Sequence, residues 1–254
     1  MLSPSQLDLV QAQFEGVYQE LETFILQDAA RRIKKAASIT STAEWQIQQA
    51  KLYNIKNIEK KIAEVLKLSQ DQVDELFPQI ANISIEQENA IYKQAKLSTI
   101  ALSESKALRD YLEAAIETTK GDLSNITQSL GFAEMQNGHI VYSDIGKFYQ
   151  KELNVAHLKV MSGASDYNSA IRQAVRKMSD SGLRYVNYKS GYSNEAYVAV
   201  RRAVLTSTRT MSQQMSIHNM DMILGKDSQR FVEVSYHSGN RPSHWWGGMV
   251  FEWK

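Results

Sequence analysis

The stretch SPSQLDLVQAQFEGVYQELETF, residues 3–24, opens the chain with the pattern of an amphipathic helix. Ser3 stands at the N-cap position, Pro4 at the first helical position, and Gln6 where a capping box is completed. The apolar residues that follow recur at alternating spacings of three and four, namely Leu7, Val10, Phe14, Val17, Leu21 and Phe24. This spacing places them on one narrow stripe, so the stretch predicts a long helix that buries one face.

Two more helical segments are predicted after it. A second capping box over residues 41–44 precedes an apolar face that runs to about Lys67. A third helix start is predicted at residues 69–72. We expect Pro78 to end or kink that helix before it resumes around residues 85–97, because proline cannot donate a helical hydrogen bond.

The last helix of this part is predicted from about Ser103 to Leu130, with an interruption near Gly121 because glycine is a weak helix former. The narrow stripes of the first two helices predict that these helices pack against each other in an antiparallel hairpin. Docking of the same stripes onto a neighbouring subunit is the alternative. We therefore expect residues 1–130 to form a helical docking region.

A change of character follows at Gly131–Gly138, GFAEMQNG, which is rich in turn residues and predicts a domain boundary. Residues 131–254 are expected to form a mixed α+β domain. Its first predicted elements are a strand at 139–142, helices at 144–161 and 167–178, a break at 179–182 and a strand at 185–188.

The rest of this domain is predicted as a long helix and a β-hairpin. Asn194 is expected to cap the helix, which runs to about Ile223 and closes at Gly225. Residues 231–236 alternate and predict a strand that pairs with 249–253 across a turn. The predicted class is α+β, predominantly α-helical, with long N-terminal helices and a small mixed domain.

The composition excludes several function classes. In 254 residues there are 29 basic and 28 acidic side chains, so a net charge of +1 creates no field that would attract DNA or an anionic bilayer. The lack of cysteine excludes disulfides and thiolate metal sites. No stretch reaches the roughly 18 apolar residues of a spanning helix, and we expect a soluble protein with no membrane partner.

A polar cluster, YHSGNRPSHWW at residues 236–246, lies on the predicted C-terminal turn. His237 and His244 are two candidate zinc ligands, but zinc needs three or four and no third ligand is placed by the sequence. A structural loop is favoured, in which His237 and Arg241 brace the turn by hydrogen bonds to backbone carbonyls.

Catalytic motifs are missing from the sequence. Neither Ser238 nor Ser243 lies in a G-x-S-x-G context, and there is no P-loop, dinucleotide-binding or zinc-protease motif. We expect no catalytic residue, no metal and no cofactor. An effector that uses His237, Arg241 and His244 is kept as a further hypothesis.

Basic residues cluster at two places. Residues 31–35 contain four cations that close the first helix, where they meet its dipole favourably. Arg201, Arg202 and Arg209 lie on the predicted late helix. Since Arg202 and Arg209 share a face, they are candidates for contact with phosphate or an acidic partner, and a solvated face is the alternative.

Two stretches of the C-terminal third carry a resemblance. They are YKSGYSNEAYVAVRRAVLT, residues 188–206, and FVEVSYHSGNRPSHWWGGMVF, residues 231–251. Together they resemble the phage minor capsid protein 2 family of tailed phages and prophages of Gram-positive bacteria. The second stretch is also similar to the R-P-x-H signature of the Mu-F-like head morphogenesis group. The positions of the family motif, with structural roles, are Asn194, Glu195, Arg201, Arg202, Thr206, His237, Gly239, Arg241, Pro242, Ser243 and His244.

The resemblance implies a structural minor capsid protein of the phage head that is not an enzyme and is assembled in the host cytoplasm. Its implied partners are the portal protein and/or the major capsid protein, at the portal vertex or inner capsid, with several copies per virion. The alternative is a DNA-binding internal head protein that is packaged and ejected with the genome. Arg201, Arg202 and Arg209 would then contact the double-stranded DNA.

Overall fold

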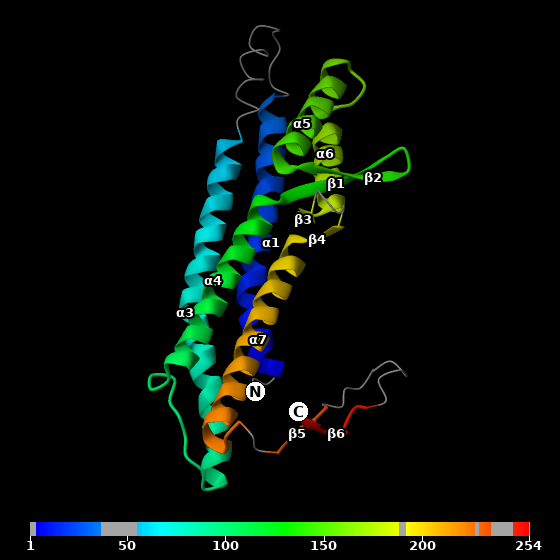
Figure 1. Cartoon of the computed structure of the whole chain (residues 1–254). Coiled ribbons are helices and arrows are strands. Elements are labelled where there is room, and N and C mark those ends of the chain that lie inside the picture. The colour runs from blue at the N-terminus through cyan, green and yellow to red at the C-terminus, as the bar shows by residue number, and fades with distance from the viewer. Residues whose placement is uncertain (1–3, 37–54, 188–191, 227–228, 235–245, 254) are drawn as a thin grey trace.

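The computed structural model describes residues 4–36, 55–187, 192–226, 229–234 and 246–253. Six helices and two small antiparallel sheets make up this described part. Helices dominate (Figure 1), which confirms the predicted α+β, predominantly α-helical class.

Four long helices form the body of the molecule (Figure 1). They are α1 (Pro4–Ala36), α3 (Lys56–Gln94), α4 (Lys106–Gln128) and α7 (Ala196–Leu224). At 1.5 Å of rise per residue, α3 with its 39 residues spans about 58 Å. The helices α1 and α3 run in opposite directions and contact each other, which confirms their predicted antiparallel pairing.

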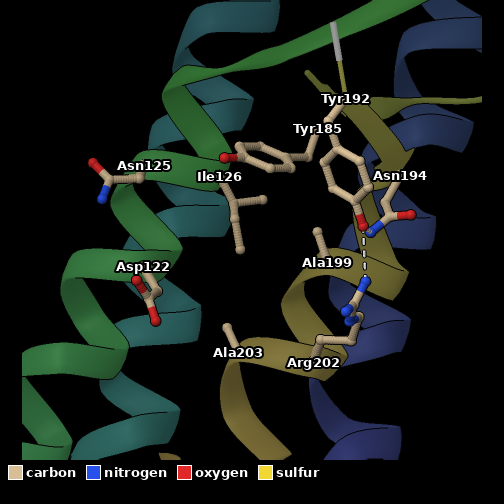
Figure 2. Close-up of a pocket in the computed structure, with 9 residues that line it drawn as sticks. All are labelled: Asp122, Asn125, Ile126, Tyr185, Tyr192, Asn194, Ala199, Arg202 and Ala203. Carbon is tan, nitrogen blue, oxygen red and sulfur yellow. Dashed lines mark hydrogen bonds between the residues drawn. The ribbon is translucent and has the colours of Figure 1, made fainter. Parts of the chain in front are cut away.

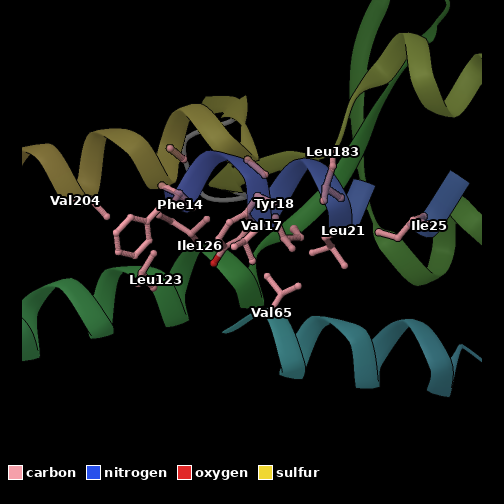
Figure 3. Packing of buried hydrophobic residues seen from close by; sticks show 14 of the residues in the cluster. Phe14, Val17, Tyr18, Leu21, Ile25, Val65, Leu123, Ile126, Leu183 and Val204 are labelled. Carbon is pink, nitrogen blue, oxygen red and sulfur yellow. The ribbon is translucent and has the colours of Figure 1, made fainter. Parts of the chain in front are cut away.

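The central helix of the body is α1, which also contacts α5, α6 and α7. Of its predicted stripe, Val10, Phe14, Val17 and Leu21 are buried, whereas Leu7 and Phe24 are only half-buried. Tyr18 and Ile25 are buried as well, so the buried face is wider than the stripe. Figure 3 shows why: side chains from several elements reach α1, including Val65 of α3, Leu123 of α4 and Val204 of α7.

The helix α3 runs without a break through two positions where the sequence predicted one. The expected start at residues 69–72 is wrong, because the Ser69 hydroxyl donates to the Val65 carbonyl at 2.8 Å inside the helix. The expected helix end at Pro78 is also wrong, because α3 continues through the proline to Gln94. Phe77 and Ile80 are buried on either side of the proline, and this packing holds the helix together. The predicted capping box at residues 41–44 lies outside the described residues.

The helix α4 likewise contradicts its predicted interruption at Gly121. This glycine is exposed, and a Cβ there would meet nothing within 4 Å. It therefore lowers the stability of the helix only through its weak intrinsic helix propensity. Leu123 and Ile126 are buried just beyond it and hold the helix against the core. The helix begins after Ser105, whose side chain accepts from the Leu108 N–H, rather than at Ser103.

A four-stranded sheet connects the helices, with strand order β2-β1-β3-β4. Its strands are β1 (Leu130–Gln136), β2 (His139–Asp144), β3 (Arg184–Asn187) and β4 (Tyr192–Glu195). The prediction that Gly131–Gly138 forms a turn is wrong for most of that stretch, which is β1. Only Asn137 and Gly138, with φ of 50° and 81°, make the turn to β2. Phe132 anchors the strand by stacking on Phe148 at 4.9 Å between ring centroids.

The helices α5 (Ile145–Met161) and α6 (Tyr167–Ser181) confirm the helices predicted at 144–161 and 167–178. Asp144 and Asp166 cap them by accepting backbone N–H hydrogen bonds. The break predicted at 179–182 is displaced, because α6 continues to Ser181 and Gly182 ends it with a φ of 66°.

The prediction that Asn194 caps the long helix is wrong. Asn194 lies in β4, and Glu195 occupies the N-cap position of α7. The Asn194 amide donates to the Tyr192 hydroxyl at 2.6 Å, so its side chain bonds to another residue of β4. Gly225 closes the helix as expected, with a φ of 84°.

The C-terminal hairpin pairs β5 (Arg230–Glu233) with β6 (Val250–Trp253), which confirms the predicted pair of strands. The turn between them falls largely at residues 235–245, outside the described part. The predicted division at residues 130/131 stays a prediction, although buried residues from both sides of it belong to one hydrophobic cluster.

Candidate functional site

The motif positions fall into two groups. His237, Gly239, Arg241, Pro242, Ser243 and His244 lie outside the described residues. The other five lie in β4, at the junction of β4 and α7, and on the first three turns of α7: Asn194, Glu195, Arg201, Arg202 and Thr206. This junction is therefore where the structure tests the sequence-derived site.

A cleft of about 430 Å³ opens at this junction, between α4, α7 and the strands β3 and β4 (Figure 2). Its lining residues are Asp122, Asn125, Ile126, Tyr185, Tyr192, Asn194, Ala199, Arg202 and Ala203. Two motif positions, Asn194 and Arg202, are thus brought together, whereas Glu195, Arg201 and Thr206 are not among the lining residues.

The cleft has an apolar base and polar walls. Ala199 and Ala203 stand one turn apart on α7 and face Ile126 of α4. Tyr185 and Asn194 are paired across β3 and β4, so their side chains emerge on the same face of the sheet. The sheet thereby supplies one wall and the two helices supply the others.

Hydrogen bonds order the Arg202 side of the cleft. The Arg202 guanidinium donates to the Tyr192 hydroxyl at 2.8 Å, and the Asn194 amide donates to the same oxygen at 2.6 Å. Figure 2 shows Arg202 and Asp122 on opposite walls with open space between them. Among the described residues Arg202 forms no ion pair, so its charge remains available to a ligand.

The three arginines predicted to contact phosphate do not form one cluster. Arg201 lies next to Arg202 but turns to α1, where it pairs with Glu15 at 3.7 Å. Arg209 is exposed further along α7 and does not line the cleft. Because an α-helix rotates by about 100° per residue, the adjacent Arg201 and Arg202 point in different directions.

Sequence reasoning missed the residues that the other elements contribute. Asp122 and Asn125 come from α4, and Tyr185 comes from β3. None of them belongs to a motif. Packing of α4 against α7 brings Asp122 and Asn125 to the cleft, and pairing of β3 with β4 brings Tyr185.

A second cluster of charged groups lies between β1, α5 and α6. The Glu134 carboxylate is buried and accepts from Lys151 at 2.6 Å and from Lys177 at 3.3 Å. Lys177 also donates to Glu152, a second buried carboxylate, at 2.5 Å. Because each carboxylate is met by an ammonium group, the cluster is suited to holding the strand on the two helices.

The pKa of Glu134 reflects these contacts. Burial by itself raises that pKa, but hydrogen bonds from Lys151, Gln136 and Lys177 outweigh burial and lower it below the ordinary 4.5. For Lys177, burial lowers the pKa, while Glu152 and Glu134 together raise it. Both shifts favour the charged forms.

The Glu134→Gln variant is expected to change how stability depends on pH. Because folding lowers the pKa of Glu134, its stabilisation is complete above the ordinary 4.5 and is lost as the pH falls through the lower folded value. In urea unfolding, the difference between wild type and Glu134→Gln should be constant above about pH 5 and shrink below it. The exposed Glu64→Gln variant is the control; an equal pH trend in both variants would contradict the prediction.

Metal and membrane contacts receive no support from the described part. Across those ranges, no group of three or more histidine, aspartate or glutamate side chains is arranged to hold a metal ion. Nor is any described helix both long and apolar enough to span a bilayer.

Comparison with known proteins gives one match. No curated protein and no solved structure matched the chain. The model of the family described as Phage minor capsid protein 2 matches residues 2–253. This match covers both resembling stretches and the helical N-terminal part, and it confirms the resemblance. The chain therefore belongs to the phage minor capsid protein 2 family, and it is a structural protein of the phage head, located in the virion.

Proposed function

We propose that the protein is built into the head at the portal vertex or the inner face of the capsid and acts there in head assembly. Its partners are the portal protein and/or the major capsid protein. It carries no catalytic activity, is present in several copies and is assembled in the host cytoplasm. Family membership supports this role, and the surface of two hairpins supports the contact with other subunits.

Exposed apolar side chains on the two hairpins carry the proposal. The β1–β2 hairpin projects from the body (Figure 1), and its cross-strand neighbours Met135 and Ile140 are 71% and 58% exposed. Phe231 and Val250, on the β5–β6 hairpin, are each 62% exposed. Clustered apolar exposure marks interaction sites. For β5–β6, which form a two-stranded sheet, a partner would add stability, because a two-stranded hairpin alone is only marginally stable in water. Docking onto capsid or portal subunits would cover these side chains.

The test is an inventory of purified heads and mature particles by mass spectrometry. The proposal expects this chain in both, cross-linked to portal or major capsid peptides. Its absence from both particles would overturn the structural role.

Polar substitutions on the projecting hairpin should reduce incorporation. The double variant Met135→Gln, Ile140→Thr removes apolar contact area while keeping the melting temperature of the purified protein close to wild type, because both side chains are exposed. The control is Leu68→Gln on α3, a single exposed apolar residue. Equal incorporation of both variants would argue against docking through this hairpin.

A second candidate function is DNA binding inside the head, followed by ejection with the genome. The charge distribution favours it: residues 131–254 contain 15 basic and 10 acidic side chains, while residues 1–130 contain 14 and 18. A gel shift at low salt tests it, with Arg201, Arg202 and Arg209 neutralised in turn. Lack of binding by the wild-type protein at low salt would reject this function.

A further inference from the structure

The cleft at the β4–α7 junction contains hydrogen-bond donors that the fold does not use. A guanidinium has five N–H donors, and the structure shows one from Arg202 going to Tyr192. The side chains of Asn125 and Tyr185 form no hydrogen bond with any residue in the described part of the chain. Donors from three different elements therefore face one cleft, which is the arrangement that recognises an anionic group.

The base of the cleft adds a second requirement for the ligand. Ile126 and Ala199 are buried, and Ala203 is half-buried. Because alanine is small, the two alanines leave apolar space between α4 and α7 beside Arg202. A ligand that fills this space has an aliphatic stem and carries its negative charge at the end of that stem.

We propose that the cleft binds a glutamate or aspartate side chain from an acidic peptide segment of a partner subunit. The carboxylate pairs with Arg202, and the methylene groups lie on the alanine base between Tyr185 and Tyr192. This inference rests on the proposed function, since it identifies one surface through which another head subunit is held. It adds the chemistry of that contact: a charge-assisted hydrogen bond above an apolar base.

Duplex DNA fits the cleft less well than a peptide side chain does. Asp122 stands on the wall opposite Arg202, so a phosphate backbone with one charge per about 1.7 Å would bring negative charge against it. A duplex is also convex and cannot enter a space of about 430 Å³. A single carboxylate brings only one negative charge into the cleft, and on a flexible stem it can bind at the Arg202 wall, away from Asp122.

The experiment is a titration of the purified, ¹⁵N-labelled full chain with an acetylated, amidated hexaglutamate peptide, followed through the Nε–Hε signal of Arg202. We expect a saturable shift that a hexaglutamine peptide does not produce. Arg202→Gln should weaken peptide binding at least about tenfold, as loss of a charge-assisted hydrogen bond requires. Ala203→Leu, which fills the base and keeps the charge, should weaken it as well.

The adjacent arginine provides a matched control. Arg201→Gln removes one positive charge from the same turn of α7, but Arg201 pairs with Glu15 outside the cleft, so affinity should stay within about twofold. Unchanged affinity in Arg202→Gln would overturn the proposal. So would Arg202-dependent binding of a duplex oligonucleotide, or displacement of the peptide by an equal concentration of inorganic phosphate. Because isolated protein is used, a negative result leaves the virion inventory unaffected.

Discussion

Replacement of Asp28 by alanine is expected to lower the free energy of unfolding by about 3–5 kcal/mol. The Asp28 carboxylate is buried in α1, where it accepts from Arg32 at 2.7 Å and from the Tyr149 hydroxyl of α5 at 2.6 Å. Arg31 adds a longer contact at 3.3 Å. Alanine would leave the Tyr149 hydroxyl without an acceptor in the core, which is why the loss should exceed that of an ordinary ion pair.

The pKa of Tyr149 agrees with its role as the donor. Burial first, and then the hydrogen bond and charge of Asp28, raise that pKa well above its ordinary value. The hydroxyl therefore stays protonated and donates to the carboxylate throughout the range in which the protein is handled. The contact joins the first helix to α5 across 121 positions of sequence.

Urea unfolding followed by circular dichroism measures the effect of Asp28→Ala. The control is Asp110→Ala, because Asp110 pairs with Lys106 on the surface of α4 at 2.7 Å and is half-exposed. That variant should change stability by less than about 0.5 kcal/mol. If both aspartates cost the same, the buried network does not stabilise the docking of α1 on α5.

The second large effect has the opposite sign: Pro78→Ala should raise the free energy of unfolding by about 1–3 kcal/mol. Pro78 lies inside α3 and has no N–H to donate to the carbonyl of Asp74. Alanine restores this hydrogen bond and removes the clash of the proline ring with the preceding turn. The gain in stability is reduced because the half-buried proline ring is lost, and with it some buried apolar area.

The measurement is again urea unfolding, here beside Phe77→Ala as a control that removes packing at the neighbouring position. Phe77 is fully buried, so that variant should be strongly destabilised. A lower stability of Pro78→Ala than of wild type would mean that a local bend at the proline is needed for α3 to follow the core.

Buried contacts between helices stabilise the body of the molecule, whereas other side chains are exposed on its surface. Buried polar contacts such as Ser84 with Ser212, at 3.0 Å, and Tyr18 with Thr127, at 2.9 Å, join helices distant in sequence. At the surface, the two hairpins expose apolar side chains, and the β4–α7 cleft exposes the charged group of Arg202.

Local patterns in the sequence determined the helix-rich class and most of the element positions. The three-and-four spacing from Val10 to Leu21 is a property of neighbouring residues, and it correctly predicts the buried face of α1. Gly225, which ends α7, could be found for the same reason. The two C-terminal stretches were sufficient to indicate the family that the match over residues 2–253 then showed.

Tertiary packing decided the points at which local signals failed. Pro78, Gly121 and Ser69 each predict a helix boundary, yet all three lie inside helices because buried neighbours outweigh a propensity cost of about 1–3 kcal/mol. Gly131 lies in β1 although its surroundings resemble a turn, because Phe132 packs on Phe148.

The candidate site depends on the tertiary structure most of all. Arg202 could be named from the sequence, but Arg201 beside it carries the same charge, and only the position of Glu15 on α1 separates their roles. Asp122 and Asn125 carry no motif and reach the cleft because α4 packs along α7. Residue type and spacing are local and readable in the chain. Which side chains contact one another across the core depends on how whole helices pack.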